Sequence, residues 1–151
     1  MKPIFFISPV RSIAVTLLIM GQASIASAHS LSGSLGNAAG ATDYYQVTCS
    51  NDGNGAPSYL ITSVKSTVTA PTPHLSVQAR VNLSASNATD PTNGDGGSSP
   101  SGKLTAGPGL YDVLVFKNGA GPQNYVLVYH CLTDKGVHTG TTDSPPPVQD
   151  Q

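Results

Sequence analysis

Four histidines, at positions 29, 74, 130 and 138, are the residues in this sequence best suited to binding a transition metal. Imidazole nitrogen is a common ligand of copper, and Cu(II) stands at the top of the affinity order of the divalent first-row ions. His29 directly follows Ala26-Ser27-Ala28, whose small residues are typical of a signal-peptidase site. Cleavage after Ala28 would make His29 the amino-terminal residue, and its α-amine and ring nitrogen could then chelate one copper ion.

A second histidine would complete a set of three nitrogens around that ion. His130 is the first choice, because it lies next to a cysteine on an expected strand and points to the opposite face from that cysteine. His138 and His74 are the other candidates, and we take His29, His130 and His138 as the predicted copper ligands. The alternative is that His29 simply follows the cleavage site and that the other histidines are exposed polar residues. The copper arrangement resembles the histidine brace of copper-handling periplasmic proteins and lytic polysaccharide monooxygenases.

The first 28 residues have the order of features found in a secretory signal peptide. Lys2 and Arg11 supply positive charge, residues 13–20 form a short apolar run, and the small residues before His29 follow. The run is shorter than the roughly 20 residues that span a bilayer, although an uncleaved anchor is the alternative. The sequence therefore predicts a cleaved signal peptide over residues 1–28 and an extracytoplasmic mature protein, periplasmic or secreted, without a membrane span.

The two cysteines, Cys49 and Cys131, predict one disulfide. Exported chains meet an oxidising environment, and the alternative of two metal-binding thiols lacks the close C-x-x-C spacing that metal sites favour. Such a bridge closes a loop of about 80 residues, for which the chain-entropy model gives up to about 4–5 kcal/mol.

Composition predicts strands and turns in place of helices. The chain has 16 glycines, 12 prolines and eight acidic residues, all aspartate, so the good helix formers are scarce. The formal net charge is −1 and no basic cluster occurs, which disfavours nucleic acid and anionic membranes as partners. The expected partner is an extracytoplasmic ligand or protein whose identity the sequence does not give.

Alternating apolar and polar residues predict a jelly-roll-like antiparallel β-sandwich over residues 29–135. In residues 43–49 and 125–131, the face that carries each cysteine is expected to point inward. Residues 82–103 are almost free of apolar side chains and are expected to form a mobile surface or ligand loop; a calcium site at Asp90, Asn93 and Asp95 is the less favoured alternative. Residues 136–151 are expected to form a flexible tail. The predicted strands cover residues 43–49, 59–65, 74–81, 110–117 and 125–131, with an edge strand within 29–42.

Three short motifs resemble the bacterial pre-peptidase C-terminal domain family. They are a D-Y-Y strand after a leucine- and glycine-containing segment, a G-x-Y-x-V-x-V strand, and an N-Y-x-L strand after a glycine-rich loop. The resemblance implies a compact β-sandwich that accompanies secreted hydrolases as an accessory or substrate-binding module, and some of these domains bind calcium. The matching residues are Asp43, Tyr44, Tyr45, Gly109, Tyr111, Val113, Val115, Asn124, Tyr125, Leu127 and Tyr129.

The sequence predicts a protein that is not an enzyme. It contains no G-x-S-x-G motif, no histidine lies in the context of a catalytic triad, and nothing singles out a pair of aspartates for glycoside hydrolysis. The favoured interpretation is an exported binding or structural module like the accessory domains of secreted hydrolases. The alternative is a periplasmic copper-binding protein that uses His29.

Overall fold

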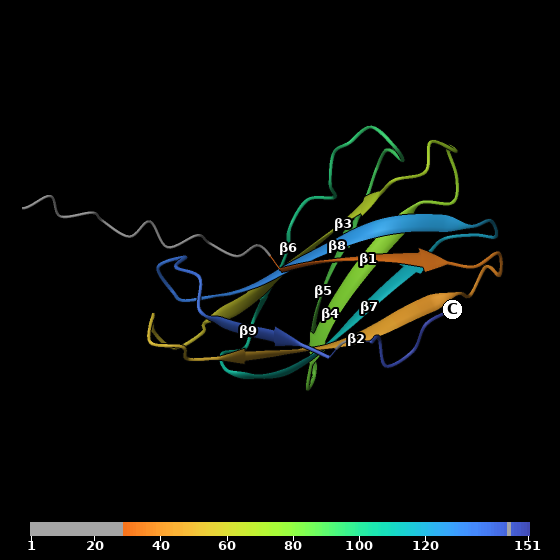
Figure 1. Cartoon of the computed structure of the whole chain (residues 1–151). Helices are drawn as coiled ribbons and strands as arrows, with labels where there is room; N and C mark the ends of the chain where they lie inside the picture. The colour runs from red at the N-terminus through yellow and green to blue at the C-terminus, as the bar shows by residue number, and fades with distance from the viewer. Residues whose placement is uncertain (1–28, 145) are drawn as a thin grey trace, which may run out of the picture.

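A computed structural model describes residues 29–144 and 146–151, and every regular element in this range is a β-strand (Figure 1). Within it, no helix has the length and apolarity needed to cross a membrane. The predicted signal peptide, residues 1–28, lies outside the described residues. The strands are β1 (His29–Leu35), β2 (Thr42–Ser50), β3 (Tyr59–Ser66), β4 (Leu75–Val81), β5 (Ser84–Thr89), β6 (Gly102–Thr105), β7 (Gly109–Lys117), β8 (Gln123–Leu132) and β9 (Gly140–Asp143).

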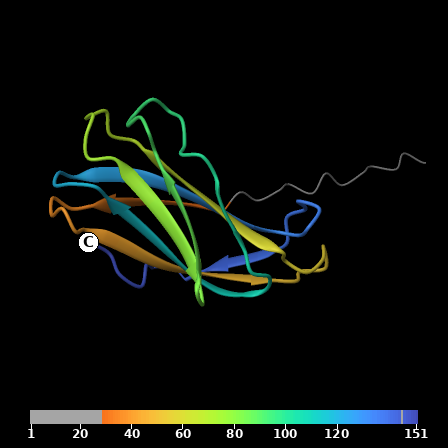
Figure 2. The ribbon, with the colours of Figure 1, turned by 180° about the vertical axis from the view of Figure 1, so that it is seen from behind.

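The strands form two sheets that pack face to face. The first sheet has the order β1-β8-β3-β6, and the second has the order β5-β4-β7-β2-β9. All neighbouring strands are antiparallel. Figure 2 shows the ribbon from behind, where β4 of the five-stranded sheet passes in front. The predicted antiparallel β-sandwich is confirmed.

Alternation along the central strands builds the core between the sheets. In β2 the residues with odd numbers from Asp43 to Cys49 are buried, and in β8 those from Gln123 to Cys131 are buried. The inward orientation expected from the cysteines is therefore correct. The largest fully buried side chains are Tyr111, Tyr125, Tyr129, Leu35, Leu60, Leu75, Leu127, Gln123, Val47, Val64, Val77 and Val113.

The expectation of one long loop over residues 82–103 is wrong. Residues 84–89, SASNAT, form β5, which pairs with β4 from Ser76↔Thr89 to Val81↔Ser84. Gly102 and Lys103 begin β6. β5 needs little apolar content because it is the edge of its sheet and is held by backbone hydrogen bonds, with Ala88 as its buried apolar residue. Hydrophobic periodicity does not detect a strand of this kind.

Residues 136–144 and 146–151 are part of the sandwich, so the predicted flexible tail over residues 136–151 is also wrong. Residues 140–143 form β9 beside β2, and the chain beyond continues along the same edge of β2. The Val148 amide donates to the Tyr44 carbonyl (2.7 Å) and the Tyr44 amide to the Gln149 carbonyl (2.9 Å). The Gly36 amide donates to the Gln151 carbonyl at 2.8 Å. Backbone pairing holds this polar, proline-containing segment, whereas its side chains offer no alternating pattern to read.

A buried hydroxyl–carboxyl network lies beneath the end of this segment. The Tyr125 hydroxyl donates to Asp43 Oδ2 (2.5 Å) and lies 2.6 Å from the Tyr45 hydroxyl, while the Gln151 amide donates to Asp43 Oδ1 (2.8 Å). Gly33 makes room for this contact, because a Cβ there would clash with the Tyr125 hydroxyl. Burial is the main cause that raises the pKa of Asp43, against the lowering effect of the two hydrogen bonds.

Asp43→Asn is expected to gain stability relative to the wild type as pH rises from about 4 to 7. Because the native pKa of Asp43 is raised, its contribution to stability is complete below the unfolded value of about 4 and is lost as pH rises through the native value. Asparagine stays neutral at every pH. In thermal unfolding at about pH 4 and pH 7, the Tm of the variant relative to that of the wild type should be higher at pH 7 than at pH 4. Asp134→Asn, in an exposed turn, is the control. An Asp43→Asn variant whose Tm falls relative to the wild type between about pH 4 and pH 7 would contradict the expectation.

Candidate metal centre

Three histidines from different parts of the chain meet at one end of the sandwich. His29 begins β1, His130 lies near the end of β8, and His138 lies in the segment between β8 and β9. Each offers one ring nitrogen, and these three nitrogens all lie within 4.8 Å of one another. The His29 and His138 rings stack with centroids 5.5 Å apart, and the His130 ring meets the His138 ring edge-on at 5.2 Å. The structure thus brings together the three predicted copper ligands.

Pairing along β8 explains why these residues meet. On one edge of β8, β3 pairs as far as Tyr59↔Leu132; on the other, β1 reaches only to His29↔Tyr129. Beyond that point the chain turns through residues 133–137 and returns along the edge of β8 that β1 leaves free. The Thr133 amide donates to the Val137 carbonyl (2.9 Å). A bridge between Leu132 and His138 follows. His29 and His138 therefore follow each other along one edge of β8, beside His130.

Gly136 makes the tight return possible. Its φ is 76°, in the left-handed region that glycine adopts without strain, and its amide donates to the Thr133 carbonyl (3.0 Å). The Thr133 hydroxyl accepts a second bond, from the Val137 amide at 3.1 Å. The turn is therefore held on both sides, and it places His138 directly opposite Leu132.

Each ring at this site has one buried nitrogen without a hydrogen-bond partner among the described residues. His29 Nδ1, His130 Nδ1 and His138 Nε2 are all shielded from solvent and make no hydrogen bond within the described part of the chain. Buried polar atoms are normally paired, and an ion bound between the three rings would supply these nitrogens with a partner. Burial, with a smaller effect of His138 and His29, lowers the pKa of His130 and favours the neutral imidazole that binds metals.

The donor set fits copper or zinc. Neutral imidazole nitrogen suits both ions, whereas calcium and magnesium require oxygen ligands. The buried Tyr129 ring lies 5.9 Å from the His29 ring, so His29 borders the hydrophobic core. Three histidines would hold the ion and leave a position open for a further ligand.

His74 does not belong to the cluster. It lies just before β4, where its backbone amide donates to Asn118 Oδ1 (2.9 Å) and its carbonyl accepts from the Asn118 amide (3.2 Å). Its Nδ1 is also buried and unpaired. An unpaired ring nitrogen is therefore not enough to mark a site, and the grouping of three is what distinguishes His29, His130 and His138.

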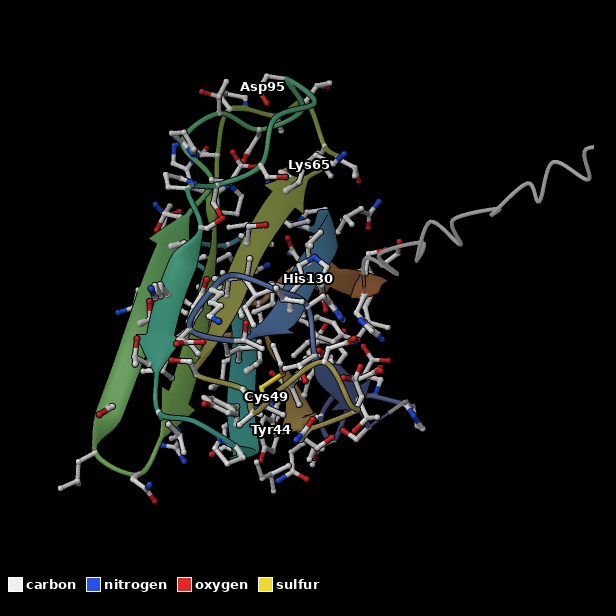
Figure 3. The ribbon with its side chains drawn as sticks, turned by 90° about the vertical axis from the view of Figure 1, so that its left-hand side faces the viewer. Tyr44, Cys49, Lys65, Asp95 and His130 are labelled. Carbon is white, nitrogen blue, oxygen red and sulfur yellow. A yellow bond between two sulfur atoms is a disulfide. The ribbon has the colours of Figure 1, made fainter. Side chains whose placement is uncertain are left out.

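The acidic loop residues have structural roles. Asp90 is buried, and its carboxylate accepts the Ser66 amide (2.7 Å) and the Thr92 amide (3.1 Å). Asp95 Oδ1 accepts the Gly97 amide (2.7 Å) and lies at the far end of the molecule from Cys49 (Figure 3). Asp95 and one oxygen of Asp90 accept amides two residues ahead in their own loops, which is the ordinary use of aspartate in turns. The other oxygen of Asp90 ties this loop to the end of β3.

The predicted disulfide between Cys49 and Cys131 is present and is adjacent to the histidines. The bond joins β2 to β8, one from each sheet, with Cα atoms 5.5 Å apart. Figure 3 shows it at the same end of the molecule as His130, which immediately precedes Cys131.

The sequence did not predict the role of Thr139, whose hydroxyl contacts with residues 50–55 anchor the segment after His138. Its identity as a threonine in a polar run carried no signal of that role.

No family model, curated protein or solved structure matches this chain. The resemblance to pre-peptidase C-terminal domains therefore stays a prediction from its motifs, and the geometry of the chain itself has to carry any functional argument.

Proposed function

We propose that this protein is an exported β-sandwich module that binds a transition-metal ion, with copper as the favoured ion, through His29, His130 and His138. The observation that carries the proposal is that one ring nitrogen from each histidine lies within 4.8 Å of the other two. Each of the three rings also has a buried nitrogen with no hydrogen-bond partner among the described residues. These residues come from three separate segments, so no local sequence constraint brings them together. The proposed role is binding, since a ligand set is what the geometry supports.

The spacing is close to what one ion requires. Two nitrogens that each lie about 2 Å from an ion are separated by at most about 4 Å. Separations of up to 4.8 Å therefore need the rings to approach by about 1 Å, which side-chain rotation can supply. Copper is favoured over zinc because Cu(II) binds a given nitrogen set more tightly.

Export would add a fourth nitrogen. If a signal peptidase cleaves after Ala28, the α-amine of His29 becomes free next to its own imidazole, and both could bind the same ion. The disulfide supports export, because such bonds persist in oxidising compartments and are rare in the cytosol. The mass of the mature protein by mass spectrometry tests this step. An amino terminus other than His29 would remove the amine from the ligand set and leave the three imidazoles.

The broader role of an accessory binding module for secreted hydrolases remains a second proposal. The sandwich of two antiparallel sheets, which is the fold that the motif resemblance implies, supports it. Metal binding and an accessory role are compatible, because the histidine cluster occupies only one end of the domain. Co-purification with a hydrolase secreted by the same cell would test the accessory role independently of metal.

His138→Ala is expected to weaken Cu(II) binding by more than the roughly 10- to 100-fold that loss of an outer-shell partner costs, because it removes a direct ligand. Isothermal titration of the purified protein with Cu(II) measures the change, and circular dichroism verifies that the variant is folded. His74→Ala is the matched control, since His74 is a histidine with an unpaired nitrogen outside the cluster. Equal Cu(II) affinities for the wild type and His138→Ala would refute the proposed site.

A further inference from the structure

We propose that the Cys49–Cys131 disulfide and Thr139 together clamp His130 and His138 in their binding positions, so that only the oxidised chain binds metal tightly. This inference rests on the proposed metal-binding function. It adds an order of events: the disulfide forms first and the metal binds afterwards. A reduced chain, such as one still in the cytoplasm before export, would then lack the assembled site.

Each of the two clamped histidines immediately precedes a residue anchored to the same short segment. His130 precedes Cys131, whose sulfur is bonded to Cys49 at the end of β2. His138 precedes Thr139, which is fully buried. The Thr139 hydroxyl lies 2.6 Å from the Gly55 carbonyl and 3.2 Å from both the Ser50 carbonyl and Asp52 Oδ1. Residues 49–55 thus hold both ligand-bearing segments.

Further bonds join the two anchors to each other. The Thr139 amide donates to the Cys131 carbonyl (3.0 Å), and the Cys131 amide donates to the Thr141 hydroxyl (3.0 Å). The disulfide therefore fixes β8 relative to β2, and these bonds transmit that position to the strand that follows His138. His29 is held separately, by its place in β1 opposite Tyr129.

The clamp matters because the ligands come from three separate segments. If only a fraction of the molecules already has the binding geometry, the apparent affinity is the intrinsic affinity multiplied by that fraction. Removing the disulfide leaves the end of β8, which carries His130, without its covalent tie to β2, while the Thr139 contacts still hold the segment of His138. Fewer molecules then present all three nitrogens together. Tight binding then requires the covalent link.

Burial of the sulfur atoms indicates that the disulfide controls assembly of the metal site during folding and does not act as a reversible redox switch afterwards. The two cysteines are 1% and 0% exposed, so a reductant cannot reach the bond in the folded protein. When the bond forms, the two thiols give two electrons and two protons to a disulfide oxidant, which becomes a dithiol. In the folded product the site stays assembled.

The test compares metal affinity with and without each part of the clamp. Zn(II) is the probe, measured by isothermal titration, because it has no redox chemistry of its own. The double variant Cys49→Ala/Cys131→Ala, which has no thiol to bind zinc, is expected to bind at least about tenfold more weakly. Thr139→Val keeps the disulfide, and its Zn(II) affinity is expected to fall by about tenfold or more. Thr89→Val is the matched control, because its hydroxyl bonds to Ser76 (2.7 Å) on the other side of the five-stranded sheet.

The outcomes separate the two proposals. Failure of the wild type to bind Zn(II) and Cu(II) overturns the metal-binding function and the clamp with it. A wild type that binds, with a folded double variant of equal affinity, overturns the clamp alone. If circular dichroism shows the double variant unfolded, Thr139→Val decides: wild-type affinity overturns the clamp, and a tenfold loss that Thr89→Val does not share supports it.

Discussion

Replacing Cys49 and Cys131 with alanine is expected to lower the free energy of unfolding by about 2–5 kcal/mol. The bond links residues 82 positions apart, so its removal returns a large amount of conformational freedom to the unfolded chain. It also leaves the ends of β2 and β8 without their covalent tie across the two sheets. Urea denaturation at 25 °C, followed by circular dichroism, measures the loss.

Thr48→Ala provides the comparison for the cysteine variant. Thr48 precedes Cys49 on β2 but points to the exposed face, so its replacement should change the free energy of unfolding by no more than about 0.5 kcal/mol. A double cysteine variant that loses no more than this would mean that the disulfide constrains a chain already compact when unfolded. The same experiment shows whether the variant is folded in the absence of urea, which the metal titration requires.

Leu127→Ala is expected to cost a comparable amount, about 2–5 kcal/mol. Leu127 is fully buried in the middle of β8, opposite Leu31 of β1 on one side and Val64 of β3 on the other. Truncation removes buried apolar surface and leaves a cavity between strands that are held by their own hydrogen bonds and cannot easily close around it. Chemical denaturation measures the difference from the wild type.

Leu83→Ala is the matched control for the core variant. Leu83 lies in the turn between β4 and β5 with its side chain fully exposed, so the same change of residue removes no packing. A change within about 0.5 kcal/mol is expected for Leu83→Ala. A Leu127→Ala protein as stable as the control would contradict the placement of Leu127 at the centre of the core.

Local patterns in the sequence were sufficient to predict the positions and the inward faces of the central strands. Alternation over residues 43–49 and 125–131 predicted which side chains point inward, because successive side chains of a strand take opposite faces whatever the partner strand is. The same alternation placed both cysteines on the core side, and their number alone left one intramolecular pairing. The fold class and the disulfide followed from these two features.

The polar elements could not be predicted in this way. β5 and the segment of Val148 and Gln149 beside β2 are held mainly by backbone hydrogen bonds. Every residue can accept such a bond, and every residue except proline can donate one. Their side chains are largely exposed and carry no period. Whether such a segment is a strand or a loop depends on whether a neighbouring strand leaves an edge free for it.

The histidine cluster also depends partly on local sequence and partly on tertiary structure. Sequence chemistry alone determined which residues could bind copper, since imidazole is a metal ligand wherever it stands, and it determined that Cys49 and Cys131 should pair. Only the tertiary structure decided that His138 joins His29 and His130 while His74 lies elsewhere. That choice depends on where β1 stops along β8 and where the returning chain takes its place, which is a property of strand register between distant segments and is encoded in no local stretch of residues.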